Sequence, residues 1–161
     1  MNGSKEFTIE AHLGADTSSV FEVLTDPSLK SRWLFGAEGV TGKLLVTDVR
    51  TGGVEIVRLN IGGGSAMMIR SEFLAVAPTE GMSFQSEVKI RGRLVSRSQV
   101  NLTILDRPGG CILRHREICE MTRPPETVER RKDLLRWLLP QIDAVAMPAA
   151  SNVIWLDALR A

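Results

Sequence analysis

The feature that most constrains this chain is a long middle stretch, residues 36–108, in which apolar and polar residues alternate. Met82, Phe84 and Val88 share one face of such a segment, and the residues between them are mostly polar. Alternation with a period of two residues is typical of strands that have one covered face and one solvated face. Turn signals rich in glycine and proline interrupt the stretch. We therefore expect an antiparallel meander.

The turn signals divide this part of the chain into separate strands. A further alternating segment precedes it, with Phe7, Ile9, Ala11 and Leu13 on one face. The pattern predicts seven strands in all, at residues 7–13, 43–49, 54–61, 66–77, 82–91, 94–105 and 111–118.

The covered face of this sheet needs a partner, which residues 124–145 can supply as a long C-terminal helix. This segment carries an apolar stripe at helical spacing that a single arginine interrupts. Because Pro140 removes a helical hydrogen bond, we expect a kink or a new turn there. The stripe consists of Val128, Arg131, Leu135, Leu138, Leu139, Ile142 and Val145.

Two short helices are expected between the first two strands. Asp16 precedes a segment with helical spacing of its apolar residues and is a candidate N-cap. Pro27 ends that helix and opens the second, because its fixed dihedral angle suits a first helical turn.

Length and composition predict one domain, residues 1–161, with its core at 7–145 and a C-terminal extension at 146–161, where a small docked helix is expected. The N-terminus shows no secretory signal, and the longest uncharged stretch, residues 144–156, is too short to span a membrane. Cys111 and Cys119 have no metal-ligand spacing, so we interpret them as reduced thiols of a cytoplasmic protein.

Charge and residue types exclude several kinds of site. A formal net charge of +1 is too small a basic excess for nucleic-acid binding. The chain has only two histidines, His12 and His115, and no carboxylate-rich ligand motif, so we expect no metal and no cofactor. The absence of tyrosine removes any phenolic acid or donor.

Several local motifs, taken in order, resemble the activator of heat-shock-protein-90 ATPase homologue family. They are FTIEAHLGADTSSVFEVLTDPSLKSRW (residues 7–33), DVRTGG (48–53), EFLAVAPTEGMSF (72–84) and the Gly109-Gly110 turn before the last strand. The resemblance spans residues 7–145. It implies the helix-grip fold of START, polyketide-cyclase and birch-pollen-allergen-like proteins, an α+β domain in which a curved antiparallel sheet of six or seven strands surrounds a long C-terminal helix.

The resemblance also implies a cavity between sheet and helix, lined by residues of both. Trp33 matches the family's tryptophan in the second helix and is expected at the mouth of the cavity. For each candidate, packing in the core explains the residue as well as ligand contact does. The candidates are Trp33, Met82, Phe84, Val88, Leu113, His115, Glu117, Leu134, Trp137, Leu138 and Gln141.

Residues 111–118 carry the most suggestive chemistry. Alternation places Leu113, His115 and Glu117 on one face, which is inward by analogy with the family. His115 and Glu117 would then lie within about 7 Å of each other. Such a pair serves as base and orienting partner, binds a polar ligand group, or only orders the cavity; we favour the last. Arg70 and Glu72 are candidates for a second buried pair.

Three functions remain open from the sequence. The first is binding of a small hydrophobic or aromatic molecule, lipids included, without catalysis. The second is a reaction of the polyketide-cyclase, dehydratase or hydrolase type with His115 and Glu117 as acid and base. The third, which the family name implies, is an interaction module that contacts a chaperone. A homodimer is also left open.

Overall fold

The computed structural model describes residues 3–36, 38–122 and 127–147. The small helix expected within residues 148–161 and the first residues of the expected C-terminal helix, 124–126, lie outside these ranges. In chain order the elements are β1 (Lys5–Leu13), α1 (Thr17–Thr25), α2 (Pro27–Leu34), β2 (Val40–Thr47), β3 (Val54–Ile61), β4 (Met67–Ala77), β5 (Gly81–Ile90), β6 (Arg93–Arg107), β7 (Gly110–Met121), α3 (Val128–Leu138) and α4 (Gln141–Ala146).

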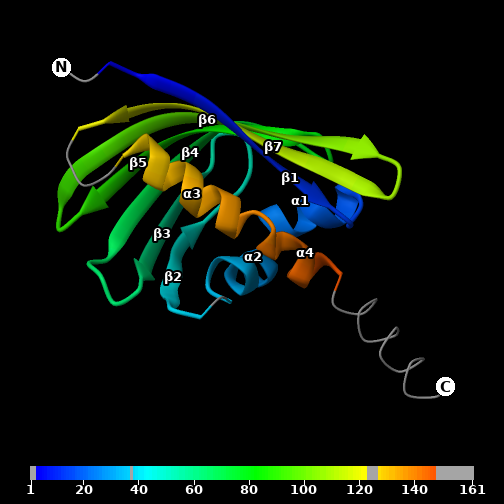
Figure 1. Cartoon of the computed structure of the whole chain (residues 1–161), viewed down its shortest axis with the longest axis horizontal. Coiled ribbons are helices and arrows are strands. Elements are labelled where there is room, and N and C mark those ends of the chain that lie inside the picture. The colour runs from blue at the N-terminus through cyan, green and yellow to red at the C-terminus, as the bar shows by residue number, and fades with distance from the viewer. Residues whose placement is uncertain (1–2, 37, 123–126, 148–161) are drawn as a thin grey trace.

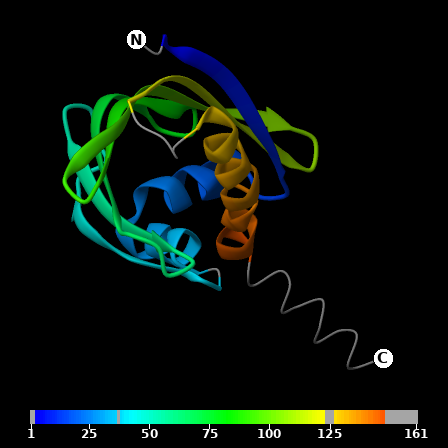
Figure 2. The same cartoon turned by 60° about the vertical axis from the view of Figure 1, so that its left-hand side comes forward.

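The strands form one antiparallel sheet of seven, in the order β1-β7-β6-β5-β4-β3-β2. Strands β2 to β7 make the expected meander. The first strand, β1, pairs with the last, β7, at one edge of the sheet. Register shifts interrupt the pairing of β2 with β3, of β4 with β5 and of β5 with β6. Such bulges bend and twist a sheet, and this one curves around α3 (Figures 1 and 2). All seven predicted strands are confirmed, with small shifts at their ends.

The two short helices cover one end of the sheet. As predicted, Asp16 caps α1, and its side chain accepts a hydrogen bond from the backbone N–H of Ser19 (2.7 Å). Asp26 caps α2 in the same way, with Pro27 at the first helical turn. Trp33 Nε1 donates to a backbone carbonyl of α1 (3.2 Å), which fastens the two helices together.

The expected C-terminal helix is present but divided at Pro140. Its first part, α3, lies in the concavity of the sheet, and α4 contacts α1 and α2 (Figure 1). Asp143 of α4 accepts hydrogen bonds from the backbone N–H groups of Gly14 (2.8 Å) and Ala15 (3.2 Å). The second part of the helix is therefore fastened to the loop that joins β1 to α1.

The main core lies between the concave face of the sheet and the helices. Cys111 and Cys119 are buried in it as free thiols, and burial raises the pKa of both. The candidate pair of Arg70 and Glu72 is not buried: both side chains are about half exposed (52% and 53%), because Ser71 occupies the inner face of β4 between them. Of the described helices, none has the length and apolar character needed to cross a membrane.

Candidate ligand-binding site

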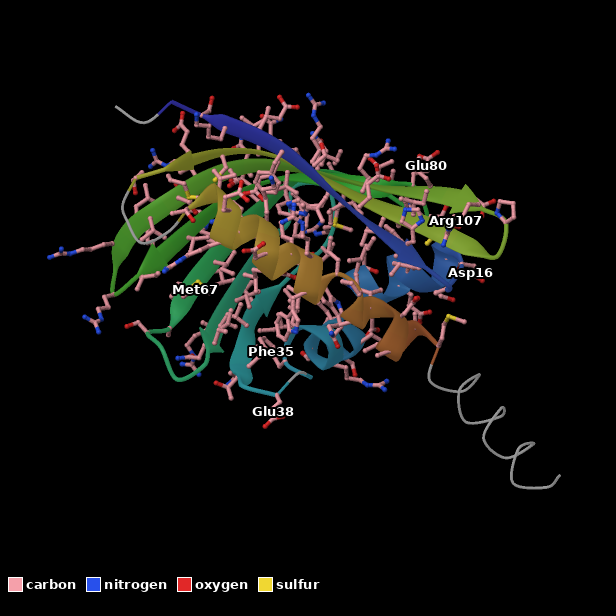
Figure 3. All side chains as sticks on the ribbon, in the orientation of Figure 1. Asp16, Phe35, Glu38, Met67, Glu80 and Arg107 are labelled. Carbon is pink, nitrogen blue, oxygen red and sulfur yellow. The ribbon has the colours of Figure 1, made fainter. Side chains whose placement is uncertain are left out.

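A cavity of about 210 Å³ lies between the concave face of the sheet and the C-terminal helix. Side chains of α1, α2, α3 and strands β3 to β7 line it, and most of them are apolar. Met67, at the beginning of β4, is one lining residue that can be located in Figure 3. Since an apolar cavity of about 150 Å³ holds a benzene molecule, the volume suits a ligand of one or two rings.

Most of the predicted contact residues line this cavity. They are Trp33, Met82, Phe84, Val88, His115, Glu117, Leu134 and Leu138. Trp33 also packs in the core and donates a hydrogen bond to α1. Its position therefore agrees both with core packing and with contact to a ligand. Whether any of these side chains binds a ligand stays a prediction.

Three predicted residues lie elsewhere. Leu113 is fully buried and belongs to the packed core. Trp137 is 39% exposed, and Gln141 begins α4 beyond the break at Pro140. The inward side of α3 instead presents Arg131, Leu134, Leu135 and Leu138 to the cavity. The predicted apolar stripe of this helix, with Arg131, Leu135 and Leu138, thus faces the cavity, whereas Trp137 and Gln141, which were predicted as ligand contacts, are not among its lining residues.

The polar end of the cavity is a cluster around the carboxylate of Glu117, whose side chain is 1% exposed. His115 Nε2 lies 2.8 Å from Glu117 Oε2, and Arg131 Nη1 donates to Oε1 at 2.8 Å. Ser98 Oγ donates to the same Oε1 at 2.5 Å. These four side chains come from β6, β7 and α3, so the cluster joins the sheet to the helix that covers it.

Glu117 remains ionised in this environment. Burial acts to raise the pKa of its carboxyl, but the hydrogen bond from His115 and the charge of Arg131 outweigh it, and the pKa is lowered from its ordinary value. A carboxylate only accepts hydrogen bonds. His115 therefore donates through Nε2–H when it is neutral, and its Nδ1 is left as an acceptor.

Among the residues that the structure describes, the contact with Glu117 is the one hydrogen bond that the His115 ring makes. The imidazole ring of His115 stacks on the ring of Phe7, with centroids 6.1 Å apart. The His115 side chain is 8% exposed. His115 lines the cavity, so a ligand that carries a hydrogen-bond donor can approach its ring.

Sequence reasoning missed the role of Arg131. The residue stood out as the one charge in the apolar stripe of the helix, and that interruption was the available signal. A buried charge on an apolar face requires a partner of opposite sign, and Glu117 is the buried carboxylate on the facing strand. Pairing the two would have needed the register of α3 against β7.

A second polar group lies at the other side of the cavity and was also missed. Lys30 Nζ on α2 contacts Glu55 Oε1 on β3 at 2.6 Å, and Thr47 donates to the other carboxylate oxygen at 3.1 Å. The side chains of Lys30 and Glu55 are 12% and 6% exposed. The signal was present in the alternation of β3, which places Glu55 on the same face as Val57 and Leu59.

A larger groove of about 450 Å³ on the outer face of the sheet is a weaker candidate. Its walls are mostly charged and polar, and Arg97 Nε is bonded to Glu87 Oε1 at 3.0 Å within it. Its charged groups thus include an exposed pair of opposite sign. Across the described residues, no group of three or more histidine, cysteine, aspartate or glutamate side chains is placed to hold a metal ion.

No protein-family model matches the sequence, and neither does any curated protein. Solved structures, in contrast, match most of the chain. Mll3558 from Rhizobium loti superposes with a TM-score of 0.76 at 23% identity, over 88% of this chain and 96% of that one. The AHSA1-like protein from Aeromonas hydrophila gives a TM-score of 0.68 at 17% identity, over 91% of this chain and 94% of that one.

A third match, DynU16 from the dynemicin biosynthetic locus, has a TM-score of 0.62 at 21% identity and covers 86% of this chain and 45% of that one. At these identities the likeness establishes the fold and not the function. The predicted resemblance is confirmed at that level: the chain has the helix-grip fold, with the curved sheet around a C-terminal helix that the AHSA1-like protein also has.

Proposed function

We propose that this protein binds a small, mainly apolar molecule in the cavity between the sheet and α3. The observation that carries the proposal is the cavity itself, about 210 Å³ with predominantly apolar walls and a few polar groups at its ends. Ligand sites typically have this composition, in which apolar walls supply affinity and a few polar groups fix orientation.

His115 orients the bound molecule. Its ring is held by Glu117 on one side and by Phe7 on the other, so the direction of Nδ1 is fixed before a ligand enters. Preorganised groups of this kind lose little entropy on binding. A hydroxyl or N–H group of the ligand is the complementary partner for Nδ1.

The comparisons support this proposal only through the fold. Fold membership does not assign a function, but it agrees with a cavity between sheet and helix. DynU16 comes from a biosynthetic locus, and a small-molecule ligand suits a protein in such a setting.

The test is to fill the cavity and measure binding of an apolar probe, α-methylstyrene, by NMR titration. Val88 lines the cavity, whereas Leu74 is 43% exposed on the other face of the sheet. We expect Val88→Trp to weaken binding by about tenfold or more, because the indole occupies the ligand's volume, while Leu74→Trp leaves it within about twofold.

Circular dichroism verifies that both variants are folded, and Val88→Phe replaces Val88→Trp if the larger side chain prevents folding. Binding by the folded Val88 variant that equals wild-type binding contradicts the proposal, as does failure of the wild-type protein to bind the probe.

Acid–base catalysis is the second candidate function, and the geometry of His115 favours it. An imidazole that is oriented by a buried carboxylate, with its other nitrogen available to a substrate, is the arrangement that general-base catalysis uses. In this case His115 accepts and returns the proton, and Glu117 holds the imidazole ring of His115 in position. Replacing His115 with Gln keeps a polar side chain but removes the base, so turnover of a substrate must fall; unchanged turnover dismisses this function.

A further inference from the structure

The concave face of the sheet carries a row of buried polar side chains that crosses four strands. Glu55 on β3 is paired with Ser71 on β4, Ser71 with Ser86 on β5, and Ser86 with Ser98 on β6. All four residues are buried. Paired residues on neighbouring strands have Cβ atoms about 5 Å apart, so the row is continuous from one polar end of the cavity toward the other.

The middle of the row faces the cavity. Ser71 and Ser86 both line it, and Ser71 Oγ lies 3.3 Å from Ser86 Oγ. A hydroxyl group has one hydrogen to donate. The bond between the two serines uses one hydrogen, and the other hydrogen has no further acceptor among the described residues.

Lys30 adds donors at the same place. Glu55, to which Lys30 is bonded, stands directly opposite Ser71 in the register. An ammonium group has three N–H donors, and the bond to Glu55 is the one that Lys30 makes among the residues described. This side of the cavity therefore keeps N–H and O–H donors that no acceptor of the described residues uses, whereas His115 presents an acceptor at the other side.

Among the described residues that line the cavity, the charges of the lysine, arginine and glutamate side chains are balanced. Lys30 is paired with Glu55, and Arg131 with Glu117, each within 2.8 Å. A charged ligand would lose its hydration on entering this site, and the described lining residues offer it no unpaired group of opposite sign, so its entry is costly.

From these observations we infer that the cavity selects uncharged ligands, and that Ser71, Ser86 and Lys30 form a subsite that binds a carbonyl or ether-type oxygen of the ligand. The ligand class is then an uncharged ring compound with an acceptor oxygen on the side of α2 and β4. This inference rests on the proposed function and adds the polarity and charge of the molecule bound.

Three probes of nearly the same shape separate these features: acetophenone, which has the acceptor oxygen; α-methylstyrene, which has a methylene group in its place; and benzoate, which is charged. Their dissociation constants are measured by NMR titration with the wild-type protein and with the Ser71→Ala/Ser86→Ala double variant. Ser83→Ala is the matched control, because Ser83 lies on β5 outside the cavity lining.

We expect the double variant to bind acetophenone about five- to tenfold more weakly, the effect of one lost hydrogen bond. Its affinity for α-methylstyrene stays within about twofold, and benzoate binds wild-type protein about tenfold more weakly than acetophenone does. The single variants serve the same purpose if the double variant does not fold.

The inference is overturned if the double variant weakens acetophenone and α-methylstyrene equally, if it weakens neither, or if benzoate binds as tightly as acetophenone. In each of these cases α-methylstyrene still binds the wild-type cavity and the proposed function stands. If α-methylstyrene does not bind at all, the proposed function fails and this inference fails with it.

Discussion

At the scale of single residues, the carboxylate of Glu117 organises the polar end of the cavity. It holds His115 on one oxygen and Arg131 and Ser98 on the other. Removing one partner of a buried ion pair leaves the other charge uncompensated, and this is far more costly than removing an exposed pair.

Replacing Arg131 with Met therefore lowers the free energy of unfolding by about 3 kcal/mol or more. Chemical denaturation measures the change. The matched control is Arg116→Met on the same strand as Glu117, because Arg116 makes an exposed ion pair with Glu6 (2.6 Å) and its loss costs less than about 1 kcal/mol. Equal losses for the two variants would contradict the structural role given to Arg131.

The lowered pKa of Glu117 also predicts a dependence of stability on pH. A carboxyl whose pKa is lower in the folded state adds stability above its unfolded pKa, near 4.5, and this stability is lost as the pH falls through the lower folded-state value. In the Glu117→Gln variant no carboxyl titrates at this position, so the part of the acid-induced loss of stability that Glu117 causes is absent. Denaturation curves recorded between neutral and acidic pH give the slope for each protein, and identical slopes would argue against the assignment.

The residues of this site were unequally predictable. His115 and Glu117 follow from alternation along one strand, because two positions of like parity share a face. Arg131 and Lys30 belong to helices, and their partners are on strands far away in the sequence. A long-range pairing of this kind depends on how a helix lies across the sheet, which local periodicity does not encode.

At the scale of elements, the division of the C-terminal helix at Pro140 separates two tasks. The part before it, α3, covers the cavity, and the part after it, α4, contacts α1 and α2. Periodicity predicted the whole segment as helical and proline chemistry predicted the break, but the direction of α4 after the break depends on what it contacts, including the bonds of Asp143 to the loop after β1.

The Asp143→Ala variant removes the hydrogen bonds that fasten α4 to this loop. We expect a loss of about 1–2 kcal/mol in stability, since charged acceptors make the stronger hydrogen bonds. Amide hydrogen exchange at Gly14 and Ala15 becomes faster, because both N–H groups lose their acceptor. Asp133→Ala is the control, since among the described residues the Asp133 side chain bonds to Arg136 on the exposed side of α3. Protection at Gly14 that survives in Asp143→Ala would refute this role.

At the scale of the whole molecule, the cavity results from the curvature of the sheet and from small side chains on its concave face. The bulges in β2, β4 and β5–β6 bend the sheet, and serines at the middle of the buried face leave space where larger residues would fill it. The meander was predictable from turn signals and alternation. The size of the cavity was not, because it depends on packing across many strands at once.

The most direct test of a ligand site in this cavity is the location of a bound probe. Methyl-labelled protein is saturated with α-methylstyrene, and intermolecular NOEs are recorded. We predict NOEs to the methyl groups of Val88 and Leu138, which line the cavity from the sheet and from α3. NOEs confined to exposed methyl groups such as those of Leu74, or no saturable binding, would contradict the account.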